Sequence, residues 1–130
     1  MNEDVFSLIR YRLQQAEESL KEALVLRDQG MSRRSVINRL YYGMFYAVLG
    51  LLQEKRMGTS KHIGAIALFD KEFIKAGLFS KDLSKTLHRV FELRQKADYL
   101  QEAEVTEEDV TEIFPRVIKF VEEIKKYFQR

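Results

Sequence analysis

The stretch from Val36 to Leu52, VINRLYYGMFYAVLGLL, constrains the fold more than any other part of the chain. From Ile37 onward it is apolar on every side of a helix, apart from Asn38, Arg39 and two glycines. A helix that is apolar all round must be covered by other elements. Its unbroken apolar run is about 12 residues, well short of the roughly 20 that a membrane-spanning helix needs. We therefore expect the central helix of a soluble bundle.

Four other segments repeat apolar residues every three or four positions, which is typical of amphipathic helices. Gly30 is expected to end the first helix, and small hydroxyl residues are expected to begin the later ones. Pro115 lies inside the last segment and is expected to kink or interrupt it. The sequence thus predicts helices at residues 3–29, 32–55, 61–76, 80–101 and from Thr106 onward.

Short connections make neighbouring helices antiparallel. Because the chain has 130 residues, one proline and no strand pattern, we expect a single all-α domain spanning residues 1–130. Its architecture should be an up-down four-helix bundle with a fifth, C-terminal helix packed alongside. The chain has no cysteine and an acidic N-terminus, so we expect a cytoplasmic protein without a membrane span. No metal-site spacing or cofactor-binding loop is present, so neither a metal nor a cofactor is expected.

Arg94 occupies a position where packing alone would favour an aliphatic side chain. The apolar seam of the segment 80–101 includes Leu87 and Val90, and its next position is Arg94. A buried unpaired charge is costly, and Asp98, one turn further on, offers a carboxylate. Two interpretations follow. Arg94 and Asp98 form a structural ion pair, or the guanidinium lies in a cleft or dimer seam and binds a phosphate.

Four further polar residues lie near the starts of predicted helices and are candidates for ligand contact. Asn38 and Arg39 enter the central helix near its start, and Asn38 is either a helix-packing contact or a ligand contact. His62 begins the third helix beside Lys61. Together with the free amides of a helix N-terminus it can meet a phosphate, or it can be a surface histidine.

Other aromatic and charged residues give weaker signals. Tyr41 is expected to be a core residue whose hydroxyl needs a hydrogen-bond partner. His88 has no acidic or metal-binding pattern around it and is expected to be structural or exposed. Basic residues gather within 27–39 and 55–61, and acidic residues within 102–112. Each group is either a solvated face or a surface that steers a partner.

Three segments, SVINRLYYGMFYA, KHIGAIALFDKEFIKAGLF and LRQKADYL, resemble the HEPN family in their order and spacing. The resemblance is to the small stand-alone prokaryotic HEPN proteins and covers nearly the whole chain. It implies an α-helical up-down bundle and a homodimer. Many such proteins are paired with a minimal nucleotidyltransferase in a toxin–antitoxin module. The best-studied branch is a metal-independent endoribonuclease.

The ribonuclease motif of that family is an arginine followed, after four to six residues, by a histidine. Its arginine corresponds to Arg94, but the histidine positions hold Tyr99, Leu100 and Gln101. Histidine moves protons near neutral pH and tyrosine is a poor base, so the missing histidine argues against RNA cleavage. Tyr99 can still orient a phosphate, stack on a base or accept a nucleotide from the partner enzyme.

Two functions remain after this comparison. The first, favoured by the missing histidine, is a partner or substrate-presenting module for a minimal nucleotidyltransferase. The alternative is a metal-independent endoribonuclease toxin or an RNA-binding protein, in which Arg94 acts with Tyr99, Asn38 or His62 in place of the lost histidine. The residues expected to contact an RNA or nucleotide phosphate around Arg94 are Asn38, Arg39, Lys61, His62 and Asp98.

Overall fold

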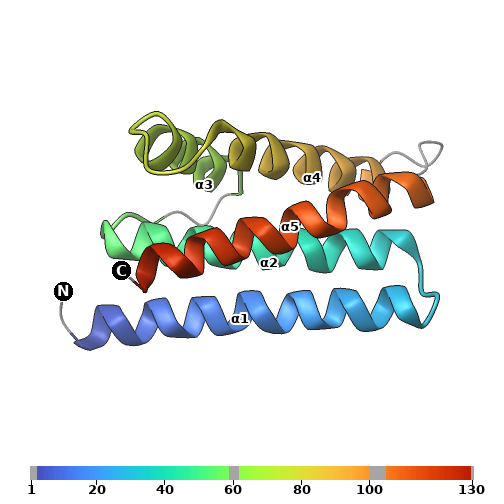
Figure 1. The fold of residues 1–130 in the computed structure, drawn as a ribbon, viewed down its shortest axis with the longest axis horizontal. Helices are drawn as coiled ribbons and strands as arrows, with labels where there is room; N and C mark the ends of the chain where they lie inside the picture. Colours follow the sequence, from blue (N-terminus) through green and yellow to red (C-terminus); the bar gives the residue numbers. More distant parts are fainter. Residues whose placement is uncertain (1–2, 59–61, 100–104, 130) are drawn as a thin grey trace.

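The computed structural model describes residues 3–58, 62–99 and 105–129. Over these ranges the chain is helical and contains no strand (Figure 1). The helices are α1 (Glu3–Asp28), α2 (Arg33–Glu54), α3 (His62–Phe69), the π-helical turn η1 (Asp70–Ile74), α4 (Lys81–Tyr99) and α5 (Glu107–Phe128). The all-α class predicted from the sequence is confirmed. No described helix is both long and apolar enough to cross a membrane.

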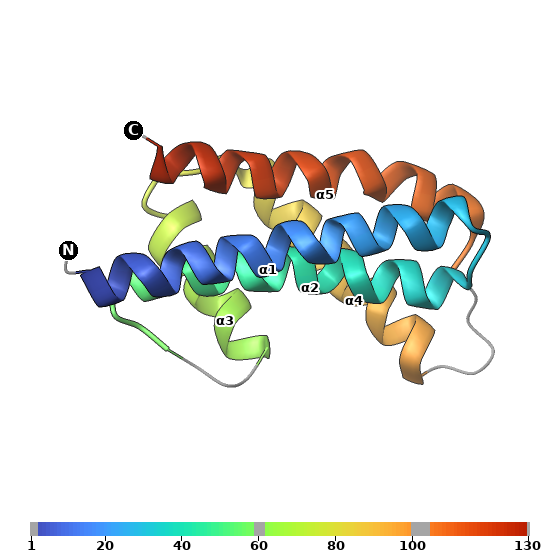
Figure 2. The same cartoon turned by 90° about the horizontal axis from the view of Figure 1, so that it is seen from below.

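The apolar helix α2 lies at the centre of the bundle, as predicted. It packs against α1, α3, α4 and α5, and the long helices run alternately in opposite directions around it (Figures 1 and 2). Its buried side chains include Ile37, Leu40 and Met44, none of which has exposed surface. The closest approach is to α1, because a Cβ placed on Gly43 would lie 2.7 Å from Cδ2 of Leu20.

Several helix ends follow the local rules read from the sequence. Gly30 adopts a φ of 69° after α1, and the Ser32 side chain accepts a hydrogen bond from the Ser35 amide at the start of α2. At the start of α5, Thr106 and Asp109 form a reciprocal capping box. These contacts are set by neighbouring residues, so they could be predicted without the fold.

The third helix differs most from its prediction. It was expected as one α-helix over 61–76, but α3 is only eight residues long and passes directly into η1. Ile63, predicted to be buried, is 69% exposed, because the short helix turns His62 rather than Ile63 towards α2. The predicted cap of this helix, Ser60, lies outside the described residues.

Pro115 does not interrupt the last helix, so that part of the prediction was wrong. The helix α5 continues unbroken from Glu107 to Phe128. Pro115 lies on its exposed side, between the buried residues Phe114 and Val117. The backbone hydrogen bond that proline cannot make is therefore missing on the side that faces water, where its loss is least costly.

Candidate functional site

Arg94 lies on the face of α4 that is turned towards α2, in line with the buried side chains of Leu87 and Val90. Its side chain is only 15% exposed. The guanidinium carbon lies 4.7 Å from the ring centre of Tyr41 and 5.6 Å from that of Tyr42. The guanidinium is thus held against two aromatic rings of the central helix, a favourable cation–π arrangement.

The hydrogen-bonding capacity of Arg94 is not fully used. Its Nε lies 3.6 Å from Oδ2 of Asp98, a distance that allows an ion pair but is too long for a hydrogen bond. Within the described part of the chain this buried Nε has no hydrogen-bond partner. Leaving a buried donor unpaired costs about 1–3 kcal/mol. The predicted pair with Asp98 exists, but it does not satisfy the guanidinium.

His62, the first residue of α3, is fixed beside Arg94 by aromatic residues of α2. Its Nδ1 lies 2.7 Å from the Tyr41 hydroxyl, and its ring stacks on Phe45 with a centroid distance of 4.3 Å and an interplanar angle of 6°. Tyr42 meets the imidazole edge-on at 5.7 Å. We call Arg94, Asp98, Tyr41, Tyr42 and His62 the Arg94 cluster.

Burial and charge set the protonation of this cluster. Burial, and secondarily the positive charge of Arg94, lower the pKa of His62 below its ordinary value of 6.5. Burial raises the pKa of Tyr41 well above that of a free phenol, although Arg94 acts in the opposite direction. At neutral pH the imidazole is therefore uncharged and the phenol keeps its proton, so the contact between His62 and Tyr41 joins two neutral groups.

Asn38 and Arg39 lie in a small pocket next to the cluster. The pocket has a volume of about 370 Å³ and shares Asp98 with the cluster. Oδ1 of Asn38 accepts hydrogen bonds from Nε and Nη2 of Arg39 at 3.1 and 2.8 Å. Arg39 also lies 5.2 Å from the Tyr42 ring. The remaining pocket residues are Leu26, Arg34 and Ser35. Three of the predicted contact residues thus line one basic hollow.

Other predicted site residues are not brought into the cluster. Tyr99 is 68% exposed, and none of the contacts described for Arg94 or His62 involves it. Lys61 lies outside the described residues. His88, expected to be structural or exposed, has a side chain that is 55% exposed, and its Nε2 lies 2.6 Å from Oδ2 of Asp70. The two residues are 18 positions apart, so helical spacing on α4 alone did not reveal this contact.

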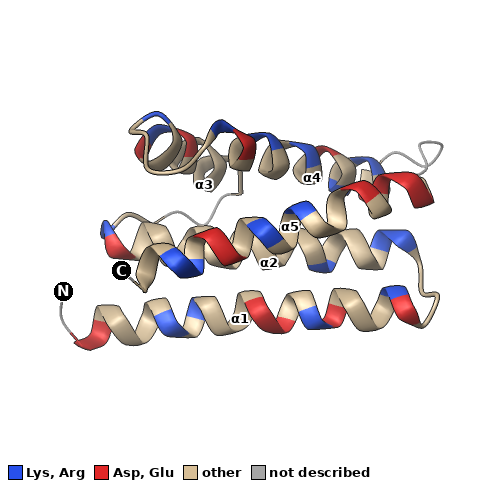
Figure 3. Ribbon diagram, in the orientation of Figure 1, with Lys and Arg blue, Asp and Glu red and all other residues tan. Residues whose placement is uncertain are grey.

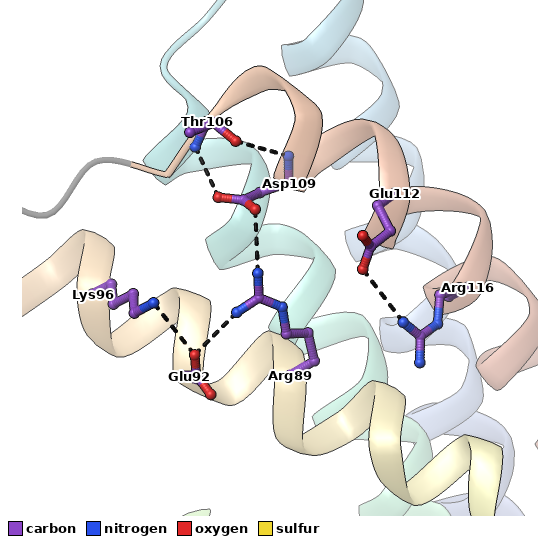
Figure 4. A network of polar contacts seen from close by, with 7 residues as sticks. All are labelled: Arg89, Glu92, Lys96, Thr106, Asp109, Glu112 and Arg116. Carbon is purple, nitrogen blue, oxygen red and sulfur yellow. Dashed lines mark hydrogen bonds and ion pairs between the residues drawn. The ribbon is translucent and has the colours of Figure 1, made fainter.

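Basic residues lie along α4 and acidic residues at the start of α5 (Figure 3), and a polar network joins the two helices (Figure 4). Arg89 contacts Asp109 at 3.2 Å and Glu92 at 3.0 Å, and Lys96 contacts the same Glu92 at 3.3 Å. The amide of Thr106 lowers the pKa of Asp109, which keeps this carboxylate charged. Arg89 and Lys96 lie on either side of Arg94 along α4, so the network holds the helix segment that carries it.

Sequence reasoning placed Tyr41 in the core and did not count it among the site residues. An all-apolar helix gives no sign of which tyrosine faces the site. The only available signal was the need of a buried phenol for a partner, and that partner is His62. Among the described residues, no group of three or more histidine, aspartate or glutamate side chains is placed to hold a metal ion.

Comparison with known proteins gives consistent matches over most of the chain. The model of the HEPN domain matches residues 9–127. A UPF0332 protein of Thermotoga maritima is 37% identical over 123 residues, which cover 94% of this chain and 92% of the relative. A protein of Methanocaldococcus jannaschii named "Putative toxin MJ0605" is 32% identical over 126 residues, which cover 97% of this chain and 92% of the relative. A second protein of that organism, named "Putative toxin MJ0142", is 32% identical over 88% of this chain and 78% of its own length.

Proposed function

This chain belongs to the HEPN domain family, and on that premise we propose that it is the toxin of a toxin–antitoxin pair and cleaves RNA without a metal ion. Arg94 binds the scissile phosphate, and His62 takes the place of the histidine that is missing from α4. The observation that carries this proposal is the buried Nε of Arg94, which has no hydrogen-bond partner among the described residues and lies beside a neutral imidazole.

The proposed reaction needs one group that removes a proton and one that stabilises negative charge. The 2′-hydroxyl of the substrate loses its proton to His62 and attacks the adjacent phosphorus. The bond to the 5′-oxygen of the next nucleotide breaks, which leaves a 2′,3′-cyclic phosphate. That oxygen leaves with the proton returned by the imidazolium. The guanidinium of Arg94 stabilises the charge that develops on the phosphate oxygens.

The hydrogen bond to Tyr41 determines which nitrogen of His62 can act as the base. When Nδ1 carries the proton and donates it to the Tyr41 oxygen, Nε2 has a free lone pair and accepts the proton of the 2′-hydroxyl. The lowered pKa of His62 favours this uncharged form at neutral pH. Tyr41 is therefore a positioning residue, and its effect should appear in the rate rather than in RNA affinity.

Growth and cleavage assays test this function. Expression of the wild-type protein should arrest growth, and the purified protein should cleave single-stranded RNA in the presence of EDTA. Arg94→Ala and His62→Gln should abolish both effects, whereas Arg116→Ala, which removes a surface ion pair with Glu112 on α5, should retain them. Cleavage that survives loss of His62 would contradict its role as the base. A wild type that neither arrests growth nor cleaves RNA would exclude the ribonuclease.

The proposed antitoxin is a minimal nucleotidyltransferase, which would inactivate this chain by adding a nucleotide to Tyr99. The exposure of the Tyr99 side chain favours this modification. Its side chain is 68% exposed and lies on the last described turn of α4, five residues after Arg94, so a transferase can reach it. Incubation with the cognate transferase and ATP should add a nucleotide to Tyr99 and stop RNA cleavage. Mass spectrometry of the peptide containing Tyr99 would detect the added nucleotide. An unmodified peptide would contradict the proposed modification of Tyr99.

We also propose that two copies associate through the face that surrounds His62. Ile63, which is 69% exposed, is a large apolar side chain directly after His62 on α3. A symmetric dimer of the kind expected from the family resemblance would bring this residue of the two copies together and cover it. Ile63→Asp should convert the dimer to a monomer in light-scattering measurements, whereas Val25→Asp on α1, also highly exposed, should not.

A further inference from the structure

A groove with lysines on both sides lies between η1 and the first turns of α4. It has a volume of about 800 Å³. Lys71 and Lys75 line it from η1 and the residue that follows, while Lys81 and Lys85 line it from α4. Each pair is four residues apart, so the two amino groups of a pair lie on one side of their helical turn. Ala67 and Ile74 provide apolar surface between the pairs.

The positive charge of this groove is not compensated within the described part of the chain. None of the four lysines forms an ion pair there, although lysines elsewhere do, such as Lys96 with Glu92. Glu72 and Asp82 lie on the same elements but do not line the groove. Like charges spaced four residues apart destabilise a helix, so this arrangement is unfavourable until a polyanion occupies it.

The one carboxylate that lines the groove is already engaged. Asp70 accepts a hydrogen bond from the Ser84 hydroxyl at 2.7 Å through Oδ1 and contacts His88 Nε2 at 2.6 Å through Oδ2. These two contacts fasten η1 to α4, and they direct both carboxylate oxygens towards protein groups. The lysine amino groups are therefore the groups of the groove left to meet a ligand.

The groove and the Arg94 cluster share two helices, α3 and α4. The short helix α3 has His62 at its start and Ala67, a groove residue, near its end. Along α4, Lys85 precedes Arg94 by nine residues and Lys81 precedes it by 13, which correspond to about 14 and 20 Å of helix axis and to roughly half a turn around it. A stacked strand carries one phosphate per about 3.4 Å, so at least about four to six nucleotides are needed to cover the axial distance and pass around the side of α4.

We propose that this lysine groove binds the phosphates of the RNA strand at least about four nucleotides away from the scissile bond. The inference rests on the proposed RNA-cleaving function and adds a substrate requirement to it. Dinucleotides and trinucleotides reach only the Arg94 cluster, whereas longer single strands contact both sites. The lysines contact phosphates rather than bases, so they favour long substrates without selecting a sequence.

Binding of uncleavable oligonucleotides tests the groove apart from cleavage. The probes are fluorescent oligouridylates of 3 and 12 nucleotides whose 2′-hydroxyls are methylated. Lys75→Gln/Lys85→Gln should weaken binding of the 12-mer at least about fivefold and leave the 3-mer unchanged. Lys21→Gln/Lys119→Gln removes the same charge from exposed positions on α1 and α5 and should change the 12-mer affinity less than about twofold. The slope of log affinity against log salt should fall by about 1.4 for the groove variant, since each contact to a single strand contributes about 0.7.

Several outcomes would overturn the proposal. Equal losses of 12-mer affinity in the groove variant and its control would show that only net charge matters. An equal loss of 3-mer and 12-mer affinity in the groove variant would place the lysines at the scissile phosphate. Displacement of the 12-mer by polyglutamate at equal charge would identify an acidic protein segment as the ligand. A wild type that binds the 12-mer but never cleaves unprotected RNA would refute the ribonuclease and leave the groove standing.

Discussion

At the scale of single residues, the buried guanidinium of Arg94 is the main departure from an ordinary helical core. Its Nε has no hydrogen bond to any residue that the structure describes, and its ion pair with Asp98 is long, with the Asp98 side chain 25% exposed. A partly satisfied buried charge destabilises a fold relative to a well-packed apolar residue. Arg94 therefore costs stability, and the proposed function explains why that cost is retained.

Replacing Arg94 should separate stability from function. Arg94→Leu restores the apolar seam of α4, so we expect the free energy of unfolding to rise by about 1 kcal/mol while RNA cleavage is lost. Chemical denaturation of both proteins at pH 7 measures this difference. Arg89→Leu is the matched comparison, because its guanidinium contacts Asp109 and Glu92 at hydrogen-bond distances and its loss should destabilise the protein. An Arg94→Leu protein less stable than wild type would mean that the charge serves the fold.

The pKa of His62 predicts how stability depends on pH. Because this pKa is lowered in the folded state, the unfolded chain binds the proton more readily at pH values below 6.5. Stability is then complete above pH 6.5 and falls as the pH drops towards the folded-state pKa. The wild type should lose more melting temperature than His62→Gln between pH 7.5 and pH 5.5. Identical losses in the two proteins would show that His62 does not titrate abnormally. RNA cleavage should rise with pH through the same pKa, because the base must be uncharged.

At the scale of helices, the sequence predicted what depends on neighbouring residues and missed what depends on the path of the chain. The capping box at Thr106 and the pair of Arg94 with Asp98 lie within one turn, so residue spacing was enough. His62 and Tyr41 are 21 residues apart, and their contact depends on the short length of α3. The spacing along α4 therefore predicted a site without a histidine, although His62 on α3 lies in the Arg94 cluster.

The close contact between α1 and α2 gives a prediction at the same scale. An added Cβ at Gly43 would lie 2.7 Å from Leu20 Cδ2, whereas at Gly50 the nearest atom, Arg12 Cβ, would be at 3.6 Å. Gly50→Ala should stabilise the protein by about 0.5–1 kcal/mol, because alanine is the better helix former. Gly43→Ala should destabilise it by about 1 kcal/mol, since the packed Leu20 side chain must shift to make room for the new methyl group. Thermal denaturation of both variants provides the test. Equal effects would mean that Leu20 moves aside freely.

At the scale of the whole molecule, ligand binding should stabilise the assembled site. A ligand at 100 times its dissociation constant adds about 2.7 kcal/mol to the free energy of unfolding. The methylated 12-mer should therefore raise the melting temperature of the wild type measurably. It should do so less for Arg94→Gln and for the lysine-groove variant, and equally for Lys21→Gln/Lys119→Gln. An increase that is the same in all four proteins would indicate nonspecific association.

The arginine and the histidine of the Arg94 cluster lie on different helices, and this has a consequence for control of the protein. In a motif contained in one helix, the arginine and the histidine keep their separation for as long as that helix exists. Here the imidazole is carried by α3 and the guanidinium by α4, and the tyrosines of α2 join them. If the proposed ribonuclease function holds, an antitoxin that moved the eight-residue α3 by the length of one hydrogen bond would inhibit cleavage without covering the Arg94 cluster. Inhibition would then result from misalignment of His62 and Arg94, and cleavage would resume as soon as the antitoxin was degraded.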